Sequence, residues 1–594
     1  MDFRRLFDLL PYQQARFPNQ AALVERGDMR WIPWSTEACL VRMNEMSAAL
    51  LELGVTRGQR VAIYAAQGSP DWLLLDMALQ QIGAVVVPIH VGLTDEEREF
   101  MLKAAQVKYC FAGDRERYEE VARIRSGVLT LERILTFRRL PDLPALEDYL
   151  QEPGQEHLEY LQTLKAGIHE DDLVTIIFTS GTSGQPQGVC LSHKNMVSNL
   201  KSIIAIVPVH CDHRVISFLP PSHVFERIVL YTYLAVGASI HFAERPSRLL
   251  DNIKEVRPHY LTVVPLVLER LYDLILQDAR SGHVYRQRLI MWAIRQGKKY
   301  NGRFRIAPWY WFKLLWADLL VYRRWRARLG GKLAGIVCGA AALRPELSRL
   351  FSAAGMEVRE GYGLTEASPV VTCNRFEPGG FRFGTAGMPI PGVQVRISEP
   401  AADGRGQIEV KGPNIMLGYL EPASTKAVMT ADGWLCTGDV GRMEQKRFLR
   451  VFGRASNVFK TGSGQFVAVR MIEQHLERSA YIHQAMVFGR NQPWLAALIV
   501  PDFIGLRDWC EKQGVHWTAP EYMVYNPIVQ QFFRDIIDQQ SSGLHKHEQI
   551  ARFELIHEPW TQEDGTLTPT FKLRRPVIYK KHAKRIDPLF AEIT

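Results

Sequence analysis

Runs of apolar residues alternate with amphipathic segments through the first half of the chain. RVAIYAA (60–66) and AVVVPI (84–89) predict buried strands, and DWLLLDMALQQIG (71–83) between them has the length and apolar spacing of a helix. Further strand-like runs are VTIIF, GASIHFA and HYLTVVP. This strand–helix–strand order predicts parallel sheets covered by helices.

The pattern changes near residue 385, where short strand-like runs such as VQVRI and GQIEV are separated by Gly, Pro and Asp turns. These runs predict a small, mostly antiparallel, β-barrel-like module over residues 385–453. Alternation of helix and strand resumes after GRASN (453–457). We therefore predict an α/β protein with a large N-terminal domain, residues 1–453, and a small α+β C-terminal domain, residues 454–594.

The composition limits the class of protein. The chain has 594 residues, of which 47% are hydrophobic and 23% charged, as expected for several folded domains. Eight scattered cysteines form no CxxC pair, and no HExxH motif or His-rich cluster suggests a structural metal. The N-terminus has no apolar stretch of signal-peptide length, and no 18-residue window is both apolar and uncharged. We expect a cytoplasmic protein without a membrane span or a nucleic-acid partner.

One strand-like run ends in a loop of small and hydroxyl-bearing residues, TIIFTSGTSGQPQG (175–188). Such a loop can surround a phosphate chain with backbone N–H groups and hydroxyls. It is not a Walker A loop, because GxxxxGK[ST] cannot be found in it, and Gln187 stands where a lysine would be expected. Taken alone, the loop fits a surface turn as well as a phosphate site.

Three further motifs follow the loop in order along the chain. EGYGLTE (360–366) ends in a carboxylate suited to magnesium, and TGD (437–439) places an aspartate where it can accept hydrogen bonds from ribose. TPTFKLRR (568–575) places Lys572 in a cationic stretch. Together the four motifs resemble the adenylate-forming superfamily of acyl-CoA synthetases, luciferases and peptide-synthetase adenylation domains. FLPPSHVFERI (218–228) and an aromatic insertion before GGKLAGIVCGAAAL (330–343) are similar to its long-chain fatty acyl-CoA synthetase branch.

The resemblance implies that ATP converts a fatty acid to an acyl-adenylate with release of pyrophosphate, and that coenzyme A then takes the acyl chain. The protein's work is to position two anions and neutralise charge. The implied ATP site comprises Thr179, Ser180, Gly181, Thr182, Ser183, Gly184, Gly339, Ala340, Gly361, Tyr362, Thr365, Asp439 and Arg454. By the same resemblance, Glu366 holds Mg²⁺ with Thr179 or Thr182. His223 lies near the reacting carboxylate, and Lys572 reaches the oxygen between the α-phosphate and the acyl group.

The resemblance also implies a mobile C-terminal domain that rotates between the two half-reactions. The hinge falls at residues 455–457, where this chain has Ser456 and Asn457 in place of the charged residue usual in relatives. The following loop, FKTGSGQFVA (459–468), would line the coenzyme A channel, with Gly462 and Gly464 allowing close backbone approach.

Each implied role has a structural alternative. Asp439 would cap a turn, His223 would be a satisfied core histidine, Glu366 a solvated helix cap, Arg454 an interdomain salt-bridge residue, and Lys572 a surface charge. Two other functions also remain open: a fatty acyl-AMP ligase that loads a carrier protein, and a non-catalytic acyl or nucleotide binder.

The insertion over residues 283–332 has an unusual composition. It carries thirteen Lys and Arg against one acid, Asp318, and five of the thirteen tryptophans, while the whole chain has a net charge of only +9. One interpretation is a helical pair packed on the large domain with solvated arginines. The other is a set of helices lying in a bilayer interface, because tryptophan flanked by basic clusters is typical of such helices. We expect peripheral contact with anionic membranes, involving Arg323, Arg324, Arg326 and Arg328.

Overall fold

The computed structural model describes residues 2–28, 30–180, 186–280, 283–302, 307–455, 458–460, 466–561, 563–567 and 573–591. The chain divides into two compact units, which are described separately. Unit 1 comprises residues 1–396, 409–437 and 443–450, and unit 2 comprises residues 397–408, 438–442 and 451–594. The domain boundary expected at residue 453 stays a prediction.

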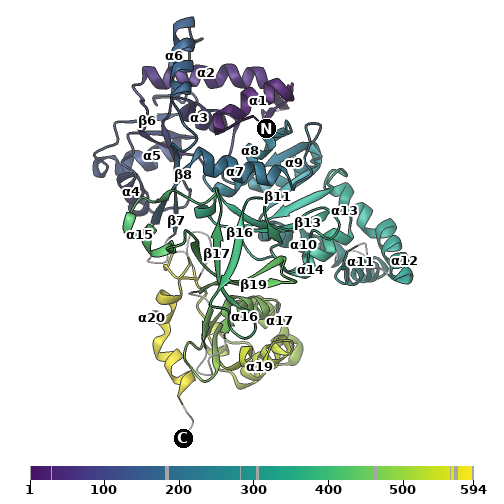
Figure 1. Ribbon diagram of the computed structural model, residues 1–594. Coiled ribbons are helices and arrows are strands. Elements are labelled where there is room, and N and C mark those ends of the chain that lie inside the picture. The colour runs from purple at the N-terminus through teal and green to yellow at the C-terminus, as the bar shows by residue number, and fades with distance from the viewer. Residues whose placement is uncertain are drawn as a thin grey trace. The chain divides into compact units, whose positions relative to one another are not determined.

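Unit 1 contains a seven-stranded sheet in the order β18-β8-β7-β4-β3-β5-β6. Figure 1 labels its strands β6, β7 and β8. The bounds are β3 Arg60–Tyr64, β4 Val85–Ile89, β5 Tyr109–Ala112, β6 Arg133–Thr136, β7 Leu173–Ser180, β8 Pro186–Ser192 and β18 Gly418–Tyr419. β3 pairs in parallel with both β4 and β5, as the strand–helix–strand pattern predicted. β8 turns back antiparallel along β7.

A nine-stranded sheet in the order β15-β14-β13-β12-β11-β9-β10-β1-β2 forms the second layer of unit 1. The bounds are β1 Leu23–Arg26, β2 Trp31–Trp34, β9 Arg214–Ser217, β10 Ser239–Phe242, β11 Tyr260–Val263, β12 Gly335–Cys338, β13 Glu357–Gly363, β14 Val370–Cys373 and β15 Met388–Pro389. Its central strands, from β10 to β13, pair in parallel. Parallel sheets layered with helices are therefore confirmed.

Helices cover these sheets, and one of them lies between the two. They are α1 Leu9–Arg16, α2 Thr36–Glu52, α3 Pro70–Gln81, α4 Asp95–Ala104, α5 Arg115–Ile124, α6 Gln155–Ala166, α7 His193–Ile204, α8 Val224–Ala235, α9 Leu249–Val256, α10 Pro265–Arg280, α11 Val284–Gly297, α12 Pro308–Ala317, α13 Arg323–Arg328, α14 Pro345–Ala353 and α15 Pro422–Val428. α3 packs against β1 of one sheet and β3 and β4 of the other, which explains why all twelve of its residues are buried.

The short-stranded region forms a four-stranded sheet in the order β16-β17-β19-β20. Its strands are β16 Gln394–Ser398, β17 Gly406–Lys411, β19 Leu435–Glu444 and β20 Phe448–Arg454. The division between the two units falls within these strands along the chain.

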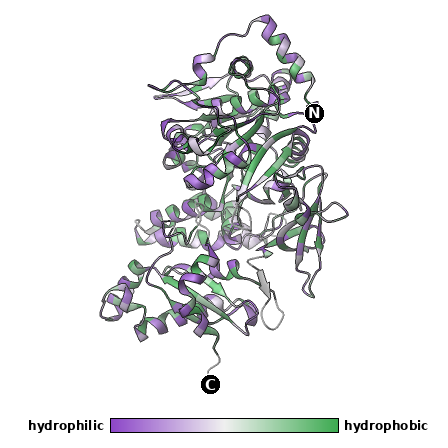
Figure 2. Ribbon diagram, turned by 90° about the vertical axis from the view of Figure 1, so that its left-hand side faces the viewer, coloured by the Kyte–Doolittle hydropathy of each residue, from purple (hydrophilic) through white to green (hydrophobic). Residues whose placement is uncertain are grey.

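The rest of unit 2 has a hydrophobic core around a three-stranded sheet, β23 Ile482–Phe488, β24 Leu495–Pro501 and β25 Ile550–Leu555. Its helices are α16 Val469–Leu476, α17 Phe503–Gln513, α18 Pro520–Met523, α19 Pro527–Ser541 and α20 Arg575–Ile586, and β21 Val458–Lys460 pairs with β22 Phe466–Ala468. Figure 2 shows hydrophobic residues concentrated along the sheet strands. Among the described residues, none of the helices has the length and apolarity that crossing a bilayer requires.

Candidate nucleotide and carboxylate site

The phosphate-loop motif joins two paired strands. Thr179 and Ser180 end β7, and they pair antiparallel with Gln187 and Pro186 of β8. The Thr175 hydroxyl, which lies earlier in β7, donates to the Val86 carbonyl of β4 at 2.7 Å. Both ends of the loop are therefore fixed by the pairing of β7 with β8, and the Thr175 side chain also ties β7 to β4. Gly181, Thr182, Ser183 and Gly184 lie outside the described residues.

Three residues of the expected ATP site, Gly339, Gly361 and Tyr362, come together at the carboxyl ends of two neighbouring strands. β12 and β13 are parallel, with Cys338 opposite Glu360, so Gly339 and Gly361 follow side by side. Tyr362 continues β13 and pairs with Thr372 of β14. The carboxyl edge of a parallel sheet is where α/β proteins usually bind ligands.

The backbone of this segment requires small residues. A Cβ atom on Gly339 would lie 2.9 Å from the ring of Phe225 on α8, closer than carbon atoms pack. Ala340 has a φ of +68°, in the left-handed region. The turn after β12 thus packs against α8 at the buried Gly339, whereas the following Ala340 is exposed.

Glu366 lies in a short 3₁₀ turn, Thr365–Ala367, and only 9% of it is exposed. The Tyr419 hydroxyl donates to its Oε1 at 2.8 Å, and the Met416 N–H donates to its carbonyl at 2.9 Å. A solvated helix cap would have neither the burial nor these partners, so that alternative for Glu366 is wrong.

Two buried asparagines fix the segment that carries Glu366. The Asn414 side chain donates to the Ala367 carbonyl at 2.7 Å, and the Asn199 side chain on α7 donates to the Val370 carbonyl at 2.7 Å. The same 3₁₀ turn packs against β8, which pairs with Thr179. The carboxylate and the threonine therefore belong to the same end of unit 1.

This donor set fits a magnesium ion. Mg²⁺ prefers oxygen ligands and is usually held by one or two carboxylates together with substrate phosphates. Glu366 offers a carboxylate oriented by Tyr419, and Thr179 a hydroxyl. Within the described part of the chain, no group of three or more His, Cys, Asp and Glu side chains forms a metal cluster.

His223 directly precedes α8 and is exposed. The alternative that it is a satisfied core histidine is therefore wrong. Its ring stacks on that of His90, with 4.1 Å between centroids, and His90 Nδ1 lies 2.9 Å from the Ser222 hydroxyl. Burial and the neighbouring His223 lower the pKa of His90 to about 3, so His90 is neutral near pH 7.

His90 is a residue that motif analysis missed. It follows β4 of the seven-stranded sheet, whereas His223 follows β9 of the nine-stranded sheet. The stack therefore joins the carboxyl ends of two sheets within unit 1. The available signal was its place directly after the strand-like run AVVVPI, which ends at a parallel-sheet edge.

Asp439 and Arg454 form a separate cluster in unit 2. Asp439 is 7% exposed inside β19, and Arg454 Nε lies 3.3 Å from its Oδ1. A turn cap would not sit inside a strand, so that alternative for Asp439 is wrong. The Arg454 contact lies within unit 2, so the interdomain salt bridge stays a prediction. Ser456, Gly462, Gly464 and Lys572 lie outside the described residues.

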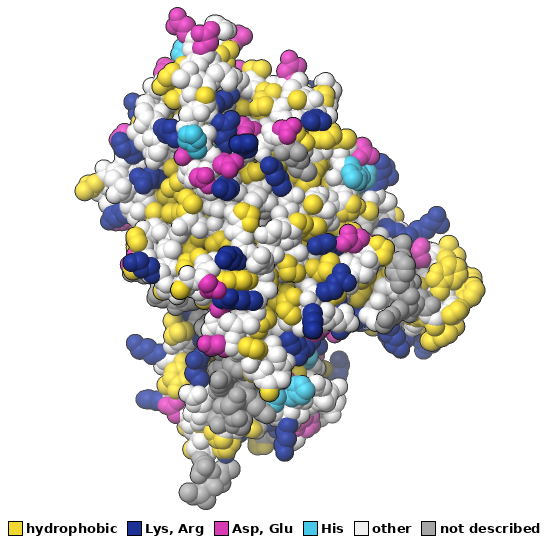
Figure 3. Space-filling model, in the orientation of Figure 1, with side chains coloured by type: hydrophobic (Ala, Val, Ile, Leu, Met, Phe, Trp, Pro, Cys, Tyr) yellow, Lys and Arg dark blue, Asp and Glu magenta, His cyan; other side chains and the backbone are white. Residues whose placement is uncertain are grey.

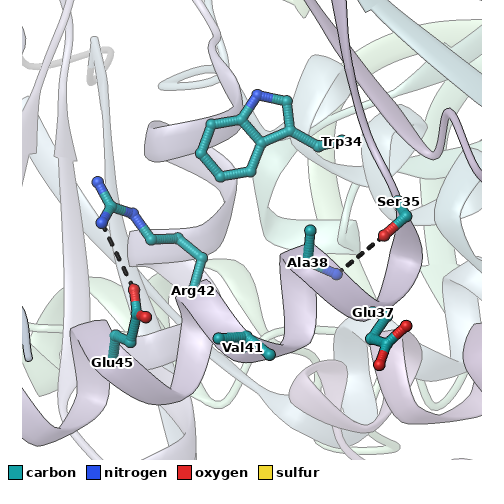
Figure 4. A pocket seen from close by; sticks show the side chains of 7 residues that line it. All are labelled: Trp34, Ser35, Glu37, Ala38, Val41, Arg42 and Glu45. Carbon is teal, nitrogen blue, oxygen red and sulfur yellow. Dashed lines mark hydrogen bonds and ion pairs between the residues drawn. The ribbon is translucent and has the colours of Figure 1, made fainter. Parts of the chain in front are cut away.

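A surface hollow over β2 and α2 contains none of the predicted site residues. Figure 4 shows its lining, where Ser35 caps α2 by accepting from the Ala38 N–H at 3.1 Å and Arg42 faces Glu45 at 3.5 Å. Both interactions stabilise the helix itself.

Comparison with known proteins identifies the class. The chain belongs to the family of AMP-binding enzymes, whose model matches residues 10–420, and the AMP-binding enzyme C-terminal domain matches residues 461–594. Long-chain-fatty-acid–CoA ligase FadD15 of Mycobacterium bovis is 29% identical over 606 residues, covering 98% of each chain. Human long-chain-fatty-acid–CoA ligase 1 is 30% identical over 593 residues, covering 94% of this chain and 83% of that one.

The fold also matches solved structures. The adenylation domain of a carboxylate reductase from Mycobacterium chelonae superposes with a TM-score of 0.73 at 21% identity, covering 99% of this chain and 91% of that one. At this identity the match concerns the fold alone.

Proposed function

We propose that the protein activates a long-chain fatty acid with ATP and transfers the acyl group to coenzyme A. A carboxylate oxygen attacks the α-phosphorus of ATP, pyrophosphate leaves, and acyl-AMP forms. The coenzyme A thiolate then attacks the acyl carbonyl carbon and AMP leaves. The observation that carries the proposal is the full-length similarity, near 30% identity, to ligases named for this reaction.

Unit 1 supports the first half-reaction. Glu366 with Thr179 or Thr182 would hold Mg²⁺, which neutralises phosphate charge when bound. Tyr419 and the two asparagines keep the Glu366 carboxylate in place before ATP arrives. Preorganised groups of this kind need no rearrangement during reaction.

His223 is placed to meet the reacting carboxylate. It is the residue just before α8, and the N-terminal end of a helix favours an anion. The stack on His90 restrains the ring, and the Ser222 hydroxyl restrains His90 in turn. We assign His90 to positioning, since it acts through His223.

The second unit would complete both half-reactions. Asp439 and Arg454 already lie in contact and would bind the ribose hydroxyls, and Lys572 would stabilise the charge at the bridging oxygen. Rotation about Ser456 would bring Gly462 and Gly464 to the coenzyme A channel. These assignments follow the family resemblance residue by residue.

Pyrophosphate exchange tests the proposal directly. Exchange that depends on fatty acid, measured from acetate to stearate, should rise with chain length, and added coenzyme A should yield acyl-CoA. Acyl transfer only to a holo-carrier protein would indicate an acyl-AMP ligase, and no exchange with any acid would indicate a binder.

Lys572→Ala separates the two half-reactions. Loss of one transition-state donor typically lowers the rate by about 10²–10³, so exchange should fall by that factor. Coenzyme A acylation from synthetic acyl-adenylate should be largely retained. Lys580→Ala is the matched control, because Lys580 is an exposed lysine of α20 nearby in sequence. An equal loss in both half-reactions would contradict the assigned role.

A further inference from the structure

The helix α12 presents large hydrophobic side chains to solvent. Five apolar residues of α12 and one of the following turn are between 50% and 63% exposed. We call these six residues the α12 patch: Trp309, Trp311, Phe312, Leu315, Trp316 and Leu319. Figure 3 shows hydrophobic side chains gathered over α12, with Lys and Arg side chains at the border. Contiguous apolar surface of this kind usually marks an interaction site.

The patch does not arise from a loosely attached helix. A π-helical turn, Asp318–Tyr322, connects α12 to α13, and the opposite side of this helical run is buried in the core of unit 1 through Ala317, Val321 and Trp325. The Tyr322 hydroxyl donates to the Ala293 carbonyl of α11 at 2.6 Å. The packing interpretation of this segment therefore holds for one side of the helix and leaves the other side unexplained.

The charge around the patch is strongly positive. The segment 283–332 carries thirteen Lys and Arg and one acid. Lys313 lies 4.5 Å from the Trp309 ring centre, and Arg323 and Arg324 are exposed on α13. Arg326 instead donates to Asp318 and to the Ala354 carbonyl, and Arg328 pairs with Asp278 at 3.1 Å. Both were expected to contact a membrane, but these contacts within the protein already engage them.

We propose that the α12 patch docks onto the surface of a bilayer that contains anionic lipid. Tryptophan favours the boundary between headgroups and acyl chains, and the basic border attracts anionic headgroups. With ten residues, α12 is about half the length needed to span a bilayer, so it lies in the interface.

A second copy of this chain fits the patch poorly. A two-fold interface would bring each patch and its basic border against the same surface of the partner. Like charges would then face one another, which opposes association. An anionic bilayer has the complementary charge.

Co-sedimentation with vesicles tests the docking without any catalytic step, so its result is independent of the proposed reaction. Full-length protein is mixed with vesicles of phosphatidylcholine alone, or of phosphatidylcholine with phosphatidylglycerol, at low and high salt. We expect tighter binding to the anionic vesicles, weakened by salt.

Two double variants separate the contribution of the tryptophans from that of the arginines. Trp311→Ala with Trp316→Ala should weaken binding roughly tenfold or more. Arg323→Glu with Arg324→Glu should weaken binding to anionic vesicles by about fivefold or more for each arginine. The matched controls lie in unit 2: Tyr522→Ala with Tyr525→Ala, and Arg507→Glu with Lys512→Glu, all at exposed positions.

Conservative variants provide a measure that does not depend on lost binding. Trp311→Phe with Trp316→Phe should keep vesicle binding but reduce the quenching of tryptophan fluorescence by brominated lipid. Unchanged binding of both patch variants, or equal losses in the controls, would overturn the proposal. Sedimentation velocity without vesicles gives the alternative outcome: a dimer abolished by the tryptophan variants would assign the patch to self-association.

Discussion

Arg227→Met should destabilise unit 1 because Arg227 and Asp76 form an ion pair closed to solvent. Both side chains are 0% exposed. Arg227 Nε lies 3.2 Å from Asp76 Oδ2, and Nη1 donates to the Thr175 hydroxyl at 2.7 Å. Nε also lies 2.9 Å from the Tyr231 hydroxyl, which donates to Asp76. The substitution therefore leaves the buried Asp76 carboxylate with the Tyr231 hydroxyl as a donor but without the Arg227 cation.

The expected loss is about 3–5 kcal/mol in the free energy of unfolding, the usual cost of removing one partner of a buried pair. Urea unfolding followed by far-UV circular dichroism measures it, with the unit 1 transition analysed separately. Adding Asp76→Leu should recover most of the loss, because a buried pair replaced by apolar residues is often neutral. Arg507→Met, at an exposed position, should change stability by no more than about 0.5 kcal/mol. A loss below about 1 kcal/mol for Arg227→Met, or no recovery in the double variant, would refute the reasoning.

Three further substitutions test the site. Burial raises the pKa of Glu226 to about 8, so the folded protein keeps a proton that the unfolded chain releases above its ordinary pKa. The free energy of unfolding should therefore fall between about pH 5 and 8, by at most about 1.4 kcal/mol per pH unit. Glu226→Gln should flatten this decline, measured by urea unfolding at several pH values. Tyr419→Phe removes a hydrogen bond to the Glu366 carboxylate, worth about 1.5–3 kcal/mol, and should lower the kcat/KM of pyrophosphate exchange about 10–100-fold while sparing coenzyme A acylation from synthetic adenylate. Gln187→Lys adds a cation near the phosphates and should raise exchange several-fold at most, about 1 kcal/mol; a substantial loss would show that the loop binds phosphate differently.

The sheets could be predicted from the sequence because buried parallel strands appear as short apolar runs bounded by turns. RVAIYAA and AVVVPI became β3 and β4, paired in the expected direction. Some motif residues could be placed because they lie at the carboxyl end of a strand. Gly339 and Gly361 are examples, since neighbouring parallel strands bring their carboxyl ends together.

Other parts of the site could not be predicted, because they depend on contacts between distant segments. His90 meets His223, and Tyr419 meets Glu366, only after two sheets and the returning chain have packed. Neither contact produces a periodic pattern or a fixed residue spacing in the sequence. The α12 segment was ambiguous for another reason: an apolar helical run looks the same in sequence whether it faces a protein core or a bilayer.

The contact between Gly339 and Phe225 couples two positions that are far apart in the chain. Any residue larger than glycine at position 339 would overlap the Phe225 ring, which a Cβ would approach to 2.9 Å. The two positions should therefore vary together during evolution, with a side chain at 339 accompanied by a smaller residue at 225. A library intended to change nucleotide preference would have to randomise both positions at once, because a larger residue at 339 meets a steric conflict unless position 225 becomes smaller.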